Sequence, residues 1–338
     1  MRLINFSIPD FFFKPPNYRI NQLSSKFLFQ TSPRYLSSSL AAPSRLGNHI
    51  FEFAGLYGLS LHLNRTPVFW IEDETYRKML ERTREVVPGL VEKFRIVEGN
   101  IPAHVNWTKF HVKSRIYDNP QRLEGVSEEY LHLTGHFYQS WKYFPKLRDE
   151  IISYLKPQNE FRTLPKSDEE THVTCVHIRR TDFLSVGFYA SDADFIRKAI
   201  QFIEDREKLK THLKLMTVMF GDDKKFMMDV YPGSVASDSK VNDVKNTTVH
   251  FVSANSPADD LLYSNQHCDT VLISAPVSTF GWWIGYLSKG NRVFYLDVRT
   301  VDDSLYKSGR LKLDDYFLPK WTALKYSSDN KTVVEASS

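Results

Sequence analysis

The residues best suited to chemistry are His177, Arg179, Arg180 and Asp182, which end or follow the apolar stretch 173–178. Guanidinium groups are planar, forked donors that suit a bidentate anion such as phosphate. Two adjacent arginines repel each other and cannot lose their protons, so a bound anion would offset their cost. Ligands of open α/β sheets bind at the carboxyl ends of strands. The cluster predicts a diphosphate site, and the alternative is a surface turn with a local Arg–Asp pair.

A second anion site is predicted where an apolar strand gives way to a helix, at Ser278, Thr279, Phe280 and Gly281. The unpaired N–H groups and the dipole of a helix N-terminus attract anions. The hydroxyls of Ser278 and Thr279 add donors, and Gly281 allows close approach. An ordinary helix cap would use the same residues.

Two polar segments are further candidates for ligand binding. In the loop before the first helix, Gly47 lets the backbone come close to another group, and Asn48 is a cap or faces a ligand. Asp222 follows an apolar strand, where its carboxylate could accept hydrogen bonds from a guanine edge or from ribose hydroxyls. A solvated turn with a helix cap is the alternative for Asp222.

The aromatic run 139–144 contains Trp141 and Tyr143, which could stack on a sugar ring. Core packing is the alternative and is slightly favoured. Asp192 and Asp194 resemble a D-x-D metal motif, but they stand just before an apolar helical pattern, where a capping side chain is needed. We therefore expect a helix cap there and no metal site.

The elements that position these residues follow from the hydrophobic pattern of the chain. In the second half, strands are predicted at 173–178, 213–220, 249–252, 270–274 and 292–297, with helices at 194–206, 224–231, 257–265 and 279–288. This alternation is typical of a parallel, doubly wound sheet. In the first half, a helix is predicted from Ile50 to near Asn64, a strand at 67–71, a strand and turn at 130–137, and helices at 75–84 and 145–155.

The domain organisation expected from this pattern has four parts. Residues 1–43 are predicted to be a poorly ordered leader and 327–338 a disordered tail. An N-terminal domain covers 44–165 and a C-terminal ligand-binding domain covers 166–326, with a linker at about 157–171.

Composition excludes several classes of protein. The net charge of +4 is spread along the chain and does not favour a nucleic-acid partner. No apolar run is long enough for a transmembrane helix or a signal peptide. Cys175 and Cys268 stand in apolar contexts, where buried free thiols are favoured over a disulfide. Five N-x-Ser/Thr sequons, at Asn5, Asn64, Asn106, Asn246 and Asn330, mildly favour the secretory pathway.

Three segments in series resemble the α-1,2-fucosyltransferases of glycosyltransferase family 11: 45–48 (RLGN), 177–182 (HIRRTD) and 278–283 (STFGWW). The resemblance covers roughly residues 44–321. It implies an α/β fold of GT-B type, with two Rossmann-like domains facing a cleft, and a C-terminal domain that binds GDP-fucose. Ser44 and Thr181 depart from the family pattern, since each replaces a glycine.

The resemblance also implies a reaction: metal-independent transfer of L-fucose from GDP-fucose, with inversion, to a glycan hydroxyl, taken as the 2-OH of galactose. No cofactor is expected besides the donor, and the acceptor glycan is carried on a glycoprotein or glycolipid. A different acceptor or linkage, or a non-catalytic GDP-sugar- or glycan-binding protein, are the alternatives. The family implies a Golgi membrane or lumen.

Roles for individual residues follow from the same resemblance. Arg179 and Arg180 are expected to hold the diphosphate, and Arg45, Gly47 and Asn48 to form a loop beside the donor, across the cleft from the sugar. An inverting transfer needs a group that removes or orients the acceptor proton. The candidates for it are Asp182, His177, His49 and Glu52, among which the sequence does not choose; a structural role is favoured for His177.

Overall fold

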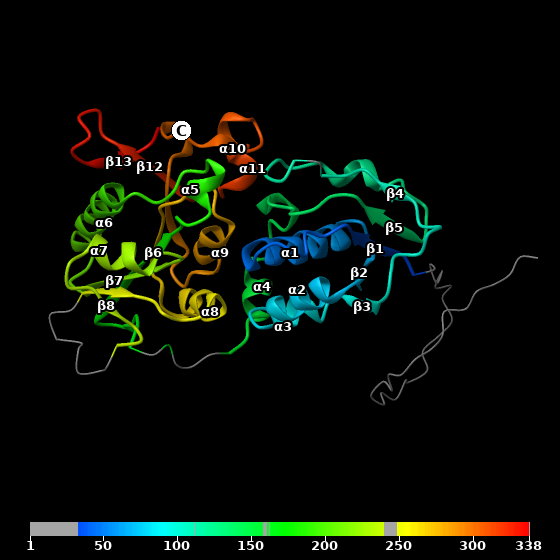
Figure 1. Cartoon of the computed structure of the whole chain (residues 1–338), viewed down its shortest axis with the longest axis horizontal. Helices are drawn as coiled ribbons and strands as arrows, with labels where there is room; N and C mark the ends of the chain where they lie inside the picture. The colour runs from blue at the N-terminus through cyan, green and yellow to red at the C-terminus, as the bar shows by residue number, and fades with distance from the viewer. Residues whose placement is uncertain (1–32, 112, 158–160, 162, 240–248, 338) are drawn as a thin grey trace, which may run out of the picture. The chain divides into compact units, whose positions relative to one another are not determined.

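The computed structural model describes residues 33–111, 113–157, 161, 163–239 and 249–337 (Figure 1). The predicted leader up to residue 32 and the sequons at Asn5 and Asn246 lie outside the described residues. Within the described part of the chain, no helix is both long and apolar enough to cross a lipid bilayer.

The first half of the described chain builds a parallel sheet with the order β3-β2-β1-β5-β4. Its strands are β1 (Tyr35–Ser38), β2 (Thr66–Ile71), β3 (Arg95–Glu98), β4 (Trp107–Thr108) and β5 (Tyr130–Leu133). The central strand β1 lies inside the predicted disordered leader, so that prediction is wrong for residues 33–43. A strand of four residues carries little periodicity, and its burial comes from its neighbours β2 and β5.

The helices of the first half are α1 (Leu46–His62), α2 (Glu74–Arg84), α3 (Pro88–Val91) and α4 (Arg148–Ser153), with 3₁₀ turns η1 (Pro120–Leu123) and η2 (Trp141–Tyr143). Most residues of α1 are buried on all sides, as expected for a helix that is apolar around its whole circumference. Helix α1 contacts β1 and β2, and it also contacts α9 (Thr279–Leu287) of the second half.

The second half builds a larger sheet with the order β13-β12-β11-β10-β6-β7-β9-β8. Its strands are β6 (Thr171–Ile178), β7 (Lys214–Gly221), β8 (Val235–Ala236), β9 (His250–Val252), β10 (Thr270–Ile273), β11 (Arg292–Leu296), β12 (Thr322–Tyr326) and β13 (Val333–Glu335). All neighbours run parallel except β12 and β13, which form an antiparallel pair. Strand β13 corrects the prediction of a disordered tail at 327–338, because it pairs with the edge of this sheet.

The helices of the second half are α5 (Phe183–Val186), α6 (Ala193–Lys208), α7 (Lys224–Val230), α8 (Pro257–His267), α9 (Thr279–Leu287), α10 (Ser304–Lys307) and α11 (Leu313–Tyr316), with a 3₁₀ turn η4 (Val298–Thr300). The strands and helices predicted for this half are confirmed to within a few residues. The expected α/β architecture, with two Rossmann-like halves facing a cleft, is also confirmed.

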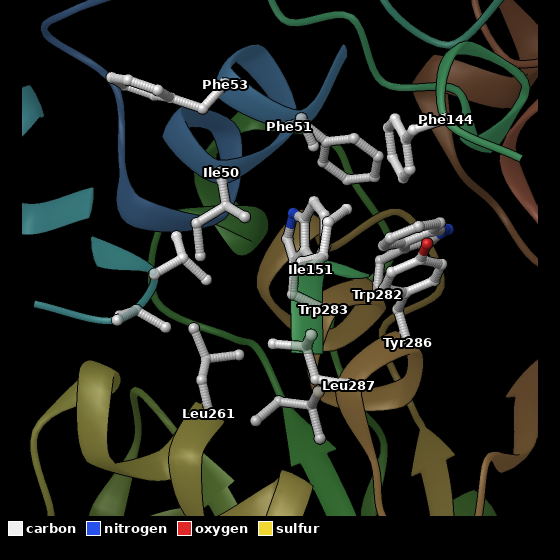
Figure 2. Close-up of a cluster of buried hydrophobic side chains, with 14 of the residues drawn as sticks. Ile50, Phe51, Phe53, Phe144, Ile151, Leu261, Trp282, Trp283, Tyr286 and Leu287 are labelled. Carbon is white, nitrogen blue, oxygen red and sulfur yellow. The ribbon is translucent and has the colours of Figure 1, made fainter. Parts of the chain in front are cut away.

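An aromatic cluster joins the two halves into one core (Figure 2). The ring centroid of Phe51, on α1, lies 4.5 Å from that of Trp282 and 5.0 Å from that of Trp283, both on α9. Phe144 stacks on Trp283, and Tyr286 continues the cluster along α9. The same core cluster includes residues of both sheets, so residues 33–338 form one compact unit.

The two cysteines form a disulfide, which corrects the prediction of buried free thiols. Cys175 lies in β6 and Cys268 follows α8, with their Cα atoms 5.6 Å apart. This separation is the usual one for a disulfide. The pairing arises because β10, which starts two residues after Cys268, lies beside β6 in the sheet. The sequence alone does not reveal which strands are neighbours.

Candidate active site

A cleft of about 940 Å³ opens between the two halves, at the carboxyl ends of β6 and β7. The residues that line it come from both halves of the chain: 43–48, 82, 85, 114–115, 137, 139, 177–179, 182–183, 188, 221–222, 255–258, 260, 277–280, 305 and 310. All three sequence segments that suggested chemistry therefore contribute to one cleft, although they lie up to about 230 residues apart.

Arg179 leaves the end of β6 and enters the cleft with two carboxylate partners. Its Nη2 donates to Asp182 at 2.8 Å, and its Nε lies 3.2 Å from a carboxylate oxygen of Asp222. The Arg179 side chain is only 13% exposed. Held from both sides, its guanidinium has little rotamer freedom left to lose when an anion binds.

Arg180 points away from the cleft and does not line it. Its guanidinium donates to the Ser191 carbonyl at 2.6 Å, lies 3.4 Å from the Asp223 carboxylate and covers the ring of Phe226 at 4.1 Å. Successive residues of an extended chain point to opposite sides, so two adjacent arginines cannot easily serve one ligand. The prediction that both hold one diphosphate therefore fits Arg179 and not Arg180.

Asp182 links the two halves across the cleft. Besides Arg179, its carboxylate pairs with Arg45 of the first half at 3.4 Å. Burial alone would raise the pKa of Asp182, but the hydrogen bond from Arg179 and the charges of Arg179 and Arg45 hold the pKa below its usual value. A carboxylate with these two partners is a poor proton acceptor, and it is well placed to orient both guanidiniums.

The N-termini of α1 and α9 meet at the cleft. A Cβ at Gly47 would lie 2.7 Å from the Phe280 nitrogen and 2.9 Å from the Thr279 carbonyl carbon, and the Trp283 indole donates to the Gly47 carbonyl at 2.9 Å. The close approach predicted for Gly47 is thus to another helix. Thr279 and Phe280 are half-buried and line the cleft.

The first turn of α9 is built as the sequence predicted, with Ser278 as its N-cap, accepting from Gly281 at 3.4 Å. Gly281 does not line the cleft: a Cβ there would lie 2.5 Å from Nδ1 of His177, so Gly281 makes room for the imidazole. His177 is buried, and its Nε2 lies 3.3 Å from the Ser278 hydroxyl. Burial, aided by the charge of Arg179, lowers the pKa of His177 to about 3, which supports the structural role favoured for it.

Asn48 lines the cleft next to Arg45, and its orientation is fixed by a residue that the sequence did not single out. Its side-chain oxygen accepts a hydrogen bond from the amide of Gln139 at 2.7 Å. Because the oxygen of Asn48 is used in this way, its NH₂ group is left to donate to a ligand.

The other two candidate bases, His49 and Glu52, are buried in α1 and do not line the cleft. Nε2 of His49 donates to the Ala42 carbonyl at 3.2 Å, and burial lowers its pKa to about 4. Oε1 of Glu52 accepts the N–H groups of Ala41 at 2.9 Å and Phe137 at 2.7 Å. Glu52 thereby holds two loops that shape the cleft, one of which contains Phe137 at a φ of 72°.

Asp222 lines the cleft, but its oxygens are engaged by the turn that carries Arg179. It accepts from the Arg180 N–H at 2.9 Å and from the Thr181 hydroxyl. Another carboxyl group at this end, Asp260, was not predicted. It is buried at the start of α8, accepts from the Ser253 hydroxyl, and has its pKa raised by burial.

The aromatic candidates for acceptor binding lie outside the cleft. Tyr143 is buried, and its hydroxyl contacts His111 at 2.8 Å; the Trp141 indole donates to the Asp314 carbonyl at 3.1 Å. These contacts fit the alternative of core packing. Asp192 accepts from the Phe195 N–H at 2.8 Å, so its predicted capping role is confirmed.

Two further side chains of the cleft, Arg115 and Gln139, were not predicted as site residues, although Gln139 begins the aromatic run 139–144. Arg115 lies in the connection between β4 and β5 and Gln139 in the connection after β5, and the Gln139 N–H donates to the Ser114 carbonyl at 3.0 Å. Their one signal in the sequence is a polar residue within a stretch rich in aromatics, which also occurs in ordinary loops.

Comparison with known proteins assigns this chain to a family. The family model described as "Glycosyl transferase family 11" matches residues 19–325. A Caenorhabditis elegans protein named "Putative galactoside 2-alpha-L-fucosyltransferase svh-11" is 48% identical over 91% of this chain and 84% of its own length. A second C. elegans protein, "Galactoside 2-alpha-L-fucosyltransferase", is 31% identical over 85% of this chain and 76% of its own.

Among solved structures, the fucosyltransferase NodZ from Bradyrhizobium superposes with a TM-score of 0.45 at 9% identity, covering 90% of this chain and 99% of NodZ. This likeness is too distant to support an argument about ligands. The match of the family model over most of the chain is sufficient: the protein is a glycosyltransferase and belongs to glycosyl transferase family 11.

Proposed function

We propose that this enzyme transfers L-fucose from GDP-fucose to the 2-hydroxyl of a galactoside, with inversion and without a metal ion. The observation that carries the proposal is Arg179, which is fixed between Asp182 and Asp222 in a cleft that also receives the N-terminus of α9. The names of the C. elegans relatives support the sugar and the linkage.

The leaving group explains why this cleft needs positive charge. When the bond between the fucose anomeric carbon and the phosphate oxygen breaks, its electron pair stays on GDP, and negative charge grows on the diphosphate. Preoriented donors stabilise such charge more than water does, because they need no reorganisation. The Arg179 guanidinium and the first N–H groups of α9 supply that stabilisation without a metal.

We assign the acceptor to the first half of the chain, which also contributes residues that contact the donor. We assign Asn48 to donate from its NH₂ group to the sugar or its phosphate, with Gln139 setting its orientation. Asp182 is assigned to position Arg45 and Arg179, since its lowered pKa makes it a weak base. His49 and Glu52 are assigned to support the loops of the cleft.

The nucleoside of the donor is assigned to the end of the cleft between β7 and α8. Asn255 and Asp260 line this end, and the Asn255 side chain interacts with the Asp260 carboxyl. Amide and carboxyl groups match the donors and acceptors of a purine edge, whereas Asp222 is engaged by the Arg180–Thr181 turn.

We assign the enzyme to the secretory pathway. The Cys175–Cys268 disulfide fits an oxidising compartment. The sequon asparagines Asn64, Asn106 and Asn330 are exposed and accessible to glycosylation. Acceptors on glycoproteins or glycolipids would be met in that compartment.

The test is calorimetric titration of the purified chain with GDP and with UDP, both in excess EDTA. We expect GDP to bind and UDP to bind much more weakly. Arg179→Gln should lower the affinity for GDP about 10- to 100-fold, because a charge-assisted hydrogen bond is worth about 1.5–3 kcal/mol. Arg180→Gln is the matched control and should cost less, since Arg180 points away from the cleft.

Transfer itself is tested by incubating GDP-fucose with a β-galactoside and determining the linkage of the product by NMR. Absence of GDP binding by the wild-type chain would refute the donor assignment. GDP binding without transfer to any galactoside would instead favour another acceptor or a non-catalytic protein.

A further inference from the structure

Arg115 is a buried cation at the wall of the cleft. The residue is 8% exposed, and among the described residues no carboxylate lies within ion-pair distance of its guanidinium. A charge that is buried without a counter-ion is costly, so such a group calls for a ligand of opposite charge. Arg115 differs in this respect from Arg179, whose charge is balanced by two carboxylate partners.

The hydrogen-bonding capacity of Arg115 is largely unused. A guanidinium offers five N–H donors. Two hydrogen bonds are present: one from Nη2 to the Val277 carbonyl at 2.9 Å and a weak one from Nη1 to the Ser114 hydroxyl at 3.4 Å. The guanidinium carbon also lies 5.4 Å from the centroid of the Tyr316 ring, a cation–π contact that uses none of the N–H donors. Nε is buried and has no acceptor within the described part of the chain.

A buried arginine can be satisfied without a carboxylate, as Arg65 demonstrates. Arg65 is 6% exposed and also has no ion-pair partner within the described ranges, but it donates to four backbone carbonyls, those of Tyr35, Val126, Glu128 and Glu129. The guanidinium of Arg115 donates to one backbone carbonyl among the described residues, that of Val277. The difference indicates that Arg65 is a structural brace and that Arg115 keeps donors free for a ligand.

The position of Arg115 identifies the ligand group. Val277, which accepts its hydrogen bond, immediately precedes Ser278, the N-cap of α9. Arg115 therefore lies beside the helix N-terminus that faces the cleft, and Arg179 lines the same cleft from the second half. Two guanidiniums and a helix N-terminus around one space form a site for an anion with several oxygens.

We propose that Arg115 is a second cationic ligand of the donor diphosphate, supplied by the first half of the chain opposite Arg179. It takes the place that sequence reasoning gave to Arg180. The assignment rests on the proposed function, since the diphosphate is that of GDP-fucose. One consequence is that both halves bind the leaving diphosphate at once, each through one arginine guanidinium.

The test compares Arg115→Gln with Arg65→Gln as the matched control for loss of a buried guanidinium. The probes are GDP, GMP and guanosine, titrated calorimetrically in EDTA, with circular dichroism to verify folding. We expect Arg115→Gln to lower the affinity for GDP by about tenfold to a hundredfold, GMP by less, and guanosine not at all. Arg65→Gln should lower the melting temperature and leave all three affinities unchanged.

A folded Arg115→Gln variant that binds GDP as the wild type does would overturn the assignment, and so would an equal loss for GDP and guanosine. If Arg115→Gln does not fold, Arg115→Lys decides the matter, because lysine keeps the charge and the stem but not the fork. It should lose several-fold in GDP affinity only; unchanged binding would reject the role. Failure of the wild-type chain to bind GDP would instead reject the proposed function.

Discussion

The chain contains two cysteines, Cys175 and Cys268, and they form one disulfide. The effect of removing this disulfide can therefore be measured without interference from other thiols. Replacing both by alanine removes a cross-link that closes a segment of 93 residues. In the chain-entropy treatment, a cross-link that closes a loop of this length lowers the entropy of the unfolded state and so destabilises that state by about 4–5 kcal/mol. Measured losses for native disulfides are about 2–5 kcal/mol, so we expect about 3–5 kcal/mol here.

The assay is thermal and urea unfolding of the wild type, both single variants and the double variant. A cost of this size corresponds to a fall in melting temperature on the order of 10 °C. Each single replacement already breaks the bond, so each should cost nearly as much as the double replacement. Such strong non-additivity is the signature of one shared interaction.

Thiol titration provides an independent check. Wild-type protein unfolded in denaturant without reductant should show no reactive thiol, and two after reduction. Two thiols before reduction would refute the disulfide. So would single-variant costs of about 1 kcal/mol each that simply add, since this is the behaviour of two separate buried thiols.

Two further perturbations test how the cleft is built. Gly47→Ala should destabilise the protein by about 1–3 kcal/mol and weaken GDP binding, because the new Cβ would press on the backbone of α9 at Phe280. Gly125→Ala is the control, since open space surrounds Gly125. Equal melting temperatures for the two variants would show that the contact of Gly47 with α9 does not contribute to stability. Burial raises the pKa of Glu52 from 4.5 to about 7. The stability that its protonated form provides is therefore complete below pH 4.5 and is lost as the pH rises through 7. The expected loss of unfolding free energy is about 3 kcal/mol at most, and it is measured by urea unfolding between pH 5 and pH 8. Glu52→Gln keeps an acceptor for the Phe137 N–H and should remove most of this pH dependence. If the stability of the variant falls with pH as steeply as that of the wild type, Glu52 is not its cause.

The sequence predicted best those elements whose burial has a regular period. The alternation of strands and helices from residue 173 to 297 is strong enough to define the second sheet and the strand end that carries Arg179. It failed for β1 and β13, which are short and become strands only because a neighbour is present to pair with them. The same reason explains the disulfide, since the contact of Cys175 with Cys268 follows from strand order.

Within the site, residue types were easier to predict than directions. The sequence identified an arginine pair but not that Arg179 enters the cleft while Arg180 covers Phe226. It also placed His49 and Glu52 near the chemistry, because they are close to Asn48 in sequence. On a helix, neighbours in sequence point in different directions, so Asn48 faces the cleft and the other two face the interior.

The glycines show why a motif can be found correctly and still be misinterpreted. Gly47 was predicted to permit a close approach, and it does, but the approaching group is the first turn of α9. That contact brings the Asn48 end of α1 next to the N-terminus of α9, while Phe51, one turn further on, packs against Trp282 and Trp283. The packing that closes the core between the halves therefore also holds the N-termini of α1 and α9 together at the cleft. A change in this small contact should affect stability and donor binding together, whereas a change in Arg179 should affect donor binding alone.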